Sequence, residues 1–517
     1  MHTQRGAVTL VADAGNIQNV LLKDLNDQQR QCVTHTYLNN TLCIAGAGTG
    51  KTRVIAKRIA FIVAMGHSTD SILAVTFTTK GASELKERVA SYIGGDANMI
   101  LMGTFHSICL KLLRQFAYLL DGYTNQFNVF NPGNCKLVLE DVLLDTIKYA
   151  DPRTINTYIN QISLMKNKLI TPDHYDSYVA DNLEVNFTAH KNGKLLARVY
   201  RDYESSMRRQ NAMDYDDLII NMIRALDIPV VYDYCRDRFK FLLIDESQDT
   251  NAAQFKLIEK MSGFNNIFLV GDTDQCIYEW RGARMENMFD FLKQYPDAIT
   301  IKLEQNYRST KTIVKASNTL IKNNRNRFDK TCFTENSTGE RINLHTATNS
   351  FNEAEFVVNE IRKLANTGYE YKDIAVLYRV NALGSLFENE LASKRIPHSV
   401  ISESCSDTVD LNDSVKYSMD NDNTVKLQTV HSAKGLEYKI VFVIGLEENT
   451  FPCYNIDEKD AAAHMEEERR LLYVAITRCQ EKLYLTRACK RMVAGAWRIL
   501  KPSPFLAEIP HVLLRFV

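Results

Sequence analysis

An apolar run that ends in a glycine-rich turn is the strongest constraint on this chain. Residues 41–45 read Thr-Leu-Cys-Ile-Ala, and residues 46–52 read Gly-Ala-Gly-Thr-Gly-Lys-Thr. Such a turn points backbone N–H groups at a triphosphate, Lys51 reaches the β- and γ-phosphates, and the Thr52 hydroxyl meets Mg²⁺. Ala45 stands where the strict pattern has glycine, and a methyl group fits there. The run predicts a strand, a P-loop and a helix that together bind ATP.

A pair of acidic residues follows a second apolar run far along the chain. Residues 241–244 read Phe-Leu-Leu-Ile and lead into Asp245 and Glu246. An acidic residue at the end of a buried strand is costly unless it meets a cation, so Asp245 is a candidate Mg²⁺ partner. Glu246 can then orient and deprotonate the attacking water. The pair favours ATP hydrolysis over nucleotide binding alone.

The composition indicates a globular chain without a global charge bias. Its 517 residues suit about two to four domains, and 45% of them are hydrophobic. Lys and Arg together number 62, as do Asp and Glu, so a nucleic-acid site has to be a local groove or patch. The 11 cysteines include no CxxC pair, which favours reduced structural thiols. Neither a membrane span nor a signal peptide is expected.

Strand-like runs alternate with helical patterns, which is typical of parallel sheets covered by helices. We expect a first group of strands at 41–45, 72–77, 241–245, 267–271 and 299–303. Residues 108–212 read as an inserted helical subdomain. A second group of strands at 341–344, 374–378, 425–429, 440–444 and 482–486 predicts a second sheet domain without its own P-loop. The polar stretch 403–424 reads as a loop.

Two arginines in the second half are candidates for contacts with the nucleotide. Arg308 lies in Gln-Asn-Tyr-Arg-Ser (residues 305–309), and Arg478 ends Tyr-Val-Ala-Ile-Thr-Arg (473–478). Guanidinium groups from a second domain can neutralise the charge that spreads over the γ-phosphoryl oxygens in the transition state. Either arginine taken alone is more often a surface salt-bridge residue.

With their flanking residues these segments resemble the UvrD/Rep/PcrA family of superfamily 1A DNA helicases. The resemblance runs nearly end to end through residues 25–30 (LNDQQR), 46–52, 76–80 (TFTTK), 103–107 (GTFHS), 213–218 (MDYDDL), 245–251 (DESQDTN), 271–283 (GDTDQCIYEWRGA), 305–309, 429–437 (TVHSAKGLE), 466–478 and 502–506 (PSPFL).

The resemblance implies an α/β fold of two RecA-like P-loop NTPase domains with parallel sheets and a helical 1B insertion in the first. It implies an N-terminal extension at 1–24, domain 1A at 25–107 and 213–305, subdomain 1B at 108–212, and domain 2A at 306–517. In the family a further subdomain, 2B, interrupts domain 2A. Here only a short loop at 398–424 is expected in its place, fewer than the roughly 50 residues that a domain needs.

The resemblance also assigns roles around ATP and Mg²⁺. Gln29 would read the adenine edge and Tyr307 would stack on the base, while Glu437 would face the ribose or γ-phosphate. Asp245 and Thr52 would hold Mg²⁺. Glu246, Gln275, Arg308 and Arg478 would be the catalytic residues. The nucleotide-binding set is Gln29, Gly46, Ala47, Gly48, Thr49, Gly50, Lys51, Thr52, Arg53, Tyr307 and Glu437.

Six positions match the family's single-strand track: Phe77, His106, Tyr278, Trp280, Arg281 and His431. A track that accepts any sequence needs flat faces, because every base has one. A lone tryptophan is more often a core residue. Trp280 nevertheless follows Gln275 by five residues, so one loop could touch both ATP and the strand.

The chain departs from the family pattern at three motif positions. Thr79 stands where asparagine is usual, which puts a strand contact in doubt. Ser247 and Cys276 replace an apolar residue and a serine, respectively, and both look like tolerated changes.

We expect an ATP-driven motor that moves 3′ to 5′ on single-stranded DNA and unwinds duplex, in repair, replication or recombination. The alternatives are a translocase that strips proteins from single strands and an ATP-dependent clamp, and an RNA track is a further possibility. The expected partners are single-stranded DNA and single/double-strand junctions, with no membrane and at most weak self-association. The expected location is intracellular: cytoplasmic (nucleoid), or nuclear in a eukaryote or its virus.

Overall fold

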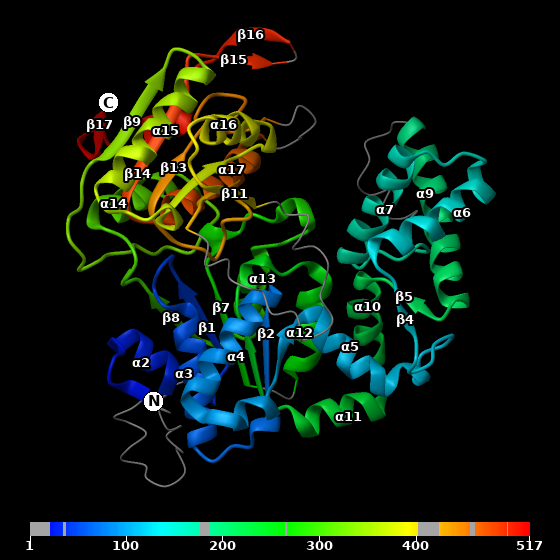
Figure 1. The fold of residues 1–517 in the computed structure, drawn as a ribbon. Coiled ribbons are helices and arrows are strands. Elements are labelled where there is room, and N and C mark those ends of the chain that lie inside the picture. Colours follow the sequence, from blue (N-terminus) through cyan, green and yellow to red (C-terminus); the bar gives the residue numbers. More distant parts are fainter. Residues whose placement is uncertain are drawn as a thin grey trace, which may run out of the picture.

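The computed structural model places two parallel sheets, each flanked by helices, and a separate group of helices beside the first sheet (Figure 1). It describes residues 21–34, 38–175, 187–263, 266–401, 423–454, 461–493 and 495–517. In Figure 1 the first sheet is blue to green, the helical group is cyan to green, and the second sheet is yellow-green to red.

The first sheet has six strands in the order β3-β2-β6-β7-β1-β8, and all its pairs are parallel. Its strands are β1 (Thr41–Ala45), β2 (Ile72–Thr76), β3 (Leu101–Thr104), β6 (Phe241–Ile244), β7 (Asn266–Gly271) and β8 (Ile299–Leu303). The helices α2 (Asp27–Thr34), α3 (Lys51–Ala64), α4 (Thr79–Ile93), α5 (Phe105–Phe116), α10 (Tyr215–Ala225), α11 (Pro229–Arg238), α12 (Ala252–Ser262) and α13 (Glu286–Gln294) accompany this sheet.

The second sheet has seven strands in the order β11-β12-β10-β13-β14-β9-β17, again all parallel. They are β9 (Ile342–Ala347), β10 (Ile374–Tyr378), β11 (His398–Ile401), β12 (Val425–Thr429), β13 (Tyr438–Val443), β14 (Cys479–Ala488) and β17 (Leu514–Phe516). Its helices are α14 (Lys311–Ile321), α15 (Ser350–Asn366), α16 (Asn381–Ser393) and α17 (Ala461–Thr477). The antiparallel hairpin β15 (Lys490–Val493) and β16 (Ala496–Ile499) follows β14.

The two parallel sheets confirm the expected α/β fold class. The central strands are buried along their whole length, as a parallel sheet covered on both faces requires, and they read as continuous apolar runs. All the strands expected from the sequence are present. The sequence did not indicate β3, β11, the β15–β16 hairpin or β17. Residues 402–422, most of the expected 398–424 loop, and residues 1–20 of the expected N-terminal extension lie outside the described residues.

The helical group has a core of its own, made by α6 (Pro132–Ile147), α7 (Pro152–Asn167) and α9 (Phe187–Arg209). This core draws on residues from Cys135 to Ala212, whereas the apolar face of α5 packs into the core of the first sheet. The two-residue strands β4 (Asn128–Val129) and β5 (Ala212–Met213) pair where the chain enters and leaves the group.

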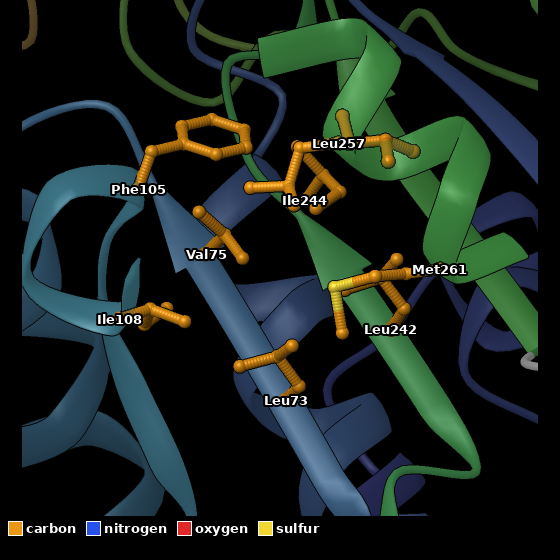
Figure 2. A pocket seen from close by; sticks show the side chains of 9 residues that line it. Leu73, Val75, Phe105, Ile108, Leu242, Ile244, Leu257 and Met261 are labelled. Atoms are coloured by element: carbon orange, nitrogen blue, oxygen red, sulfur yellow. The ribbon is translucent and has the colours of Figure 1, made fainter. Parts of the chain in front are cut away.

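The core of the first sheet contains a cavity of about 10 Å³ between β2, β6, α5 and α12 (Figure 2). Its lining is entirely apolar: Leu73, Val75, Phe105, Ile108, Leu242, Ile244, Leu257, Ile258 and Met261. A water molecule needs polar partners as well as room, so this cavity is dry.

The ten cysteines among the described residues are all free thiols. In the described part of the chain no helix combines the length and apolar character that a membrane span requires.

Candidate ATP site and nucleic-acid interface

The P-loop connects β1 to α3, at the carboxyl end of the first sheet. Gly48 and Gly50 have φ angles of +69° and +84°, which glycine adopts without strain. A Cβ atom on Gly48 would lie 2.7 Å from Asn306 Nδ2, so a larger residue is excluded by space as well. Helix α3 begins at Lys51, and its N-terminal N–H groups therefore face the turn. The loop has the form of an anion cradle.

Asp245 and Glu246 follow β6 and face the P-loop lysine. Lys51 Nζ lies 3.1 Å from Glu246 Oε1. Burial, followed by the charge of Glu246, raises the pKa of Asp245 to about 7. Burial also acts against ionisation of Glu246, but Lys51 and Lys434 outweigh it and lower its pKa to about 2. Glu246 has a φ of +51°, a strained conformation for a residue with a side chain, which is common at functional sites.

The residues expected to hold Mg²⁺ fit that ion by their chemistry. Asp245 is a buried carboxylate whose charge is costly without a cation, and Thr52 supplies a hydroxyl from the first turn of α3. Mg²⁺ prefers such hard oxygen ligands beside a substrate phosphate.

Gln248 connects Glu246 to the segment after β7, a role that the sequence did not reveal. Its Nε2 donates to Glu246 Oε2 at 2.5 Å, and its Oε1 accepts from Asp272 N at 2.8 Å. Asp272 Oδ2 in turn accepts from Gln275 Nε2 at 2.7 Å. A chain of hydrogen bonds therefore runs from the expected base to the expected γ-phosphate sensor.

The two expected arginine fingers approach this site from the second half of the chain. Arg478 is buried and its Nη2 donates to Gln275 Oε1 at 3.3 Å. Burial, and then Arg308, lower the pKa of Arg478 to about 9. Arg308 Nε donates to Glu437 Oε2 at 2.6 Å, and Arg308 Cβ lies 2.8 Å from the position of a Cβ on Gly48. The structure thus places Arg308 beside the P-loop, with Glu437 paired to it, and Arg478 beside Gln275.

The expected adenine site also lies beside the P-loop. Gln29 Nε2 donates to Thr49 O at 2.9 Å, while its Oε1 accepts from Asn26 N at 3.2 Å. Tyr307 is 45% exposed, as a stacking surface requires, and its hydroxyl accepts from Asn26 Nδ2 at 2.9 Å. Arg53, on the first turn of α3, is 3.5 Å from Asp24.

Asn306 is a further residue that the sequence did not single out. Its Nδ2 donates to Ala47 O at 2.8 Å, and its Oδ1 accepts from the N–H groups of Arg308 and Ser309. Tyr307 N donates to Gly48 O at 2.9 Å. The segment that connects the two sheets, which contains Asn306 and Tyr307, is therefore hydrogen-bonded directly to the P-loop. The sequence signal for Asn306 was its place within the motif of residues 305–309.

Five of the six residues expected on the strand track form one cluster, which we call the aromatic cluster: Phe77, Tyr278, Trp280, Arg281 and His431. The rings of Phe77 and Tyr278 stack with centroids 5.4 Å apart, and His431 lies 6.0 Å from Tyr278 and 6.1 Å from Trp280. The Arg281 guanidinium lies 4.4 Å from the Trp280 ring centre. Trp280 is 55% exposed, which contradicts a core role for this tryptophan.

His106 lies apart from the aromatic cluster and instead meets Tyr215 at 6.2 Å. Burial lowers its pKa to about 4. Burial together with Arg379 and Arg281 lowers the pKa of His431 to about 3. Both imidazoles are therefore neutral at pH 7, and they can offer ring faces and neutral hydrogen bonds rather than cations.

Lys434 joins the aromatic cluster to the ATP site across the two sheets. Its ammonium group pairs with Asp249 and donates to Gln275 O at 2.7 Å. It also lies 5.1 Å from the centre of the Tyr278 ring. The Lys434 ammonium group of the second domain thus contacts both the ATP site and the aromatic cluster of the first domain.

Comparison with known proteins decides the family. The UvrD/REP helicase N-terminal domain matches residues 25–296, and the UvrD-like helicase C-terminal domain matches 301–405 and 406–490. The chain belongs to the UvrD/Rep helicase family. The ATP-dependent DNA helicase PcrA of Staphylococcus aureus (strain MRSA252) is 32% identical, over 96% of this chain and 87% of that protein. PcrA of Staphylococcus epidermidis (strain ATCC 12228) is 31% identical, over 96% and 88%.

This family consists of ATP-dependent DNA helicases, so the chain is a helicase-type enzyme that uses ATP and acts on DNA. The individual roles of the site residues stay predictions. The alignment with the S. aureus helicase has 653 positions, more than the 517 residues of this chain, so that relative carries at least 136 positions without a counterpart here. A solved C-terminal domain of a possible DNA helicase from Lactobacillus plantarum is 18% identical, covers 41% of this chain and 98% of that domain, and has a TM-score of 0.27.

Proposed function

We propose that the chain is a motor that uses ATP and Mg²⁺ to move 3′ to 5′ along single-stranded DNA and to unwind the duplex ahead of it. The observation that carries the proposal is the single segment from Asp272 to Arg281. Its first half is hydrogen-bonded to Gln248 and Arg478, and its second half supplies three members of the aromatic cluster. ATP-driven closure of the two sheets would therefore displace the residues that hold the bases.

The proposed chemistry follows from the contacts of the site. The P-loop and Lys51 bind the phosphates, Asp245 and Thr52 hold Mg²⁺, and Glu246 takes the proton of the attacking water. Arg308 and Arg478 neutralise the charge that develops on the γ-phosphoryl group. When bound there, Mg²⁺ would supply positive charge that neutralises the phosphate oxygens. Both arginines follow the first sheet in sequence, and Arg478 lies in the second sheet domain, between α17 and β14. The proposed hydrolysis therefore requires both domains.

We further propose that subdomain 2B is absent and that residues 306–517 form one RecA-like domain, 2A. The 653-position alignment supports this, because the relative's extra positions are numerous enough for a whole subdomain. The expected partners are single strands and strand junctions, and the expected state is a monomer or a weak oligomer. Repair, replication or recombination would supply such DNA inside the cell.

An unwinding assay tests the proposed function. Fluorescently labelled duplexes with a 3′ tail, a 5′ tail or blunt ends would be incubated with the protein, with and without ATP and Mg²⁺. We expect ATP-dependent separation of the 3′-tailed duplex only. Separation that prefers the 5′ tail would refute the polarity.

A second assay decides between the motor and its two rivals. Streptavidin is placed on a biotinylated single strand, and its release is measured. Release without any unwinding would establish the stripping translocase. ATP-dependent retention of DNA with neither activity would establish the clamp.

A further inference from the structure

The C-terminal end of α7 lies against the part of the first domain where the ATP side and the strand side meet. Helix α7 packs on α10 and α12, two helices of the first domain. A Cβ on Gly282 would have the Cβ of Asn167, the last residue of α7, as its nearest neighbour at 3.6 Å. Gly282 follows Trp280 and Arg281 directly. The helical group therefore contacts the loop that carries the exposed tryptophan.

Two functional segments run side by side at this place. We call residues 245–251, which begin with Asp245 and Glu246, the carboxylate segment, and residues 278–284, which contain Trp280, the platform segment. They are joined by an antiparallel bridge between Asn251 and Ala283 and by Arg284 N donating to Thr250 O at 3.0 Å. Asn287 Nδ2 adds a bond to Thr250 O at 2.8 Å. These bonds hold the end of the carboxylate segment against the platform segment.

Asn167 is hydrogen-bonded to this junction. Its Oδ1 accepts from Asn251 Nδ2 at 2.5 Å, and its Nδ2 donates to Ser163 O, within α7, at 2.9 Å. The other polar atoms of Asn251 serve helix α12, because its Oδ1 accepts from Gln254 N at 2.8 Å and its N donates to Gln254 Oε1. The Asn251 amide group thus links the cap of α12 to the end of α7.

The end of α7 is held in place by a buried charge cluster. Lys166, directly before Asn167, is fully buried and lies 2.6 Å from Glu204, 2.8 Å from Asp214 and 2.7 Å from Asp217. Asp214 caps α10 and Glu204 lies on α9, so one ammonium group ties the helical group to the first domain. The ion pairs of Lys166 therefore hold the end of α7 in place, and with it the side chain of Asn167. Loss of one member of such a cluster leaves a charge unpaired.

We propose that Asn167 is a positioning residue that fixes the platform segment relative to the carboxylate segment and thereby couples strand binding to ATP hydrolysis. This inference rests on the proposed function, because it requires that DNA stimulates hydrolysis. Asn167 is hydrogen-bonded to none of the residues that are assigned to ATP chemistry. Its removal leaves the P-loop, Glu246 and both arginines in place, and it takes away the support that α7 gives to the junction of the two segments at Asn251 and Gly282.

The test compares Asn167→Ala with Asn160→Ala, an exposed asparagine on the same helix. ATPase rates would be measured with and without oligo-dT, together with oligo-dT affinity by fluorescence anisotropy. We expect Asn167→Ala to keep basal turnover and oligo-dT affinity within about twofold and to lose about tenfold of the stimulated turnover, the size expected for one lost buried hydrogen bond. Asn160→Ala should match the unchanged protein.

Two further measurements separate positioning from general stability. Asn251→Asp keeps the α12 cap but removes the donor to Asn167, so it should reproduce the loss, and adding Asn167→Ala to it should change little more. With Trp497→Phe in every protein, Trp280 is the only tryptophan. Its emission change on binding oligo-dT should differ between Asn167→Ala and the parent protein.

Three outcomes would overturn the inference or its basis. Full stimulation in Asn167→Ala would refute the positioning role. Equal loss of basal and stimulated turnover, with a lowered melting temperature, would show that the residue only stabilises the fold. An unchanged chain that oligo-dT does not stimulate would instead refute the proposed function itself.

Discussion

At the residue scale, the ion pair between Lys51 and Glu246 joins the expected phosphate ligand to the expected general base. Glu246→Gln should bind ATP and DNA normally but reduce turnover by about 10² to 10⁴, because a general base acts only in the transition state. Steady-state ATPase and nucleotide-binding assays measure this, with the exposed Glu87→Gln as control. Lys51→Ala should weaken ATP binding as well. Near-normal hydrolysis in Glu246→Gln would exclude it as the base.

The arginines Arg308 and Arg478 permit a second prediction at this scale. Replacing either by alanine should lower DNA-stimulated turnover by about a thousandfold with little change in ATP affinity, because the charge that they neutralise develops on the γ-phosphoryl group during transfer. Rapid-quench hydrolysis and equilibrium ATP binding separate the two effects. Arg478 is fully buried, so circular dichroism must first show that its variant is folded. A mainly weakened ATP affinity would indicate ground-state binding instead.

Trp280 provides the third prediction. Trp280→Ala should spare basal hydrolysis and weaken oligo-dT binding by roughly 10- to 100-fold, since one stacked base contributes about 1–3 kcal/mol. Anisotropy titrations measure the affinity, and Tyr118→Ala removes an exposed aromatic ring elsewhere as a control. Parallel loss of basal and stimulated rates would point to a packing role.

At the element scale, Lys166 ties the end of α7 to α9 and α10 through three buried ion pairs. Lys166→Met should lower the free energy of unfolding by about 3–5 kcal/mol, because Glu204, Asp214 and Asp217 would stay buried without their cation. Urea denaturation followed by circular dichroism measures this loss. The exposed Lys136→Met on α6 should cost less than about 0.5 kcal/mol. Similar values for both would show that the cluster contributes no net stability.

The same scale shows which elements the sequence could predict. Strands such as β1, β6 and β10 are apolar runs at the expected residues, because a strand covered on both faces must be apolar throughout. The strand β11 was missed because it is an only partly buried strand at the sheet edge, and β3 because Gly103 interrupts a short run. The hairpin β15–β16 has largely exposed faces and hence no pattern of burial.

The candidate site was predictable where a motif carries its own chemistry. The P-loop, the two carboxylates and both arginines come together as the motifs indicated. The roles of Gln248 and Asn306 depend on partners that are distant in sequence, Asp272 and Ala47, so no local pattern encodes them. The separation of His106 from the aromatic cluster likewise follows from packing against Tyr215.

At the scale of the whole molecule, the proposed absence of subdomain 2B leads to a fifth prediction. Without that subdomain a monomer lacks both a restraint on unwinding and a grip on the duplex. We expect unwinding of 3′-tailed duplex to be proportional to protein concentration, with few base pairs separated in each binding event. Single-turnover unwinding over a range of concentrations measures both quantities. A concentration threshold would show that the active form is an oligomer.

The order of strands in the first sheet also affects how the protein folds during its synthesis on the ribosome. Strand β1 pairs with β7 and β8, which begin at Asn266 and Ile299, while β1 begins at Thr41. At about 5–20 residues per second, a ribosome would extrude β1 roughly 10 to 50 s before its neighbours exist. During that interval the apolar strand β1 and the helix α3 that follows it lack the neighbouring strands that cover them in the folded protein. Nascent chains of this protein should therefore depend on chaperones far more than the finished molecule does.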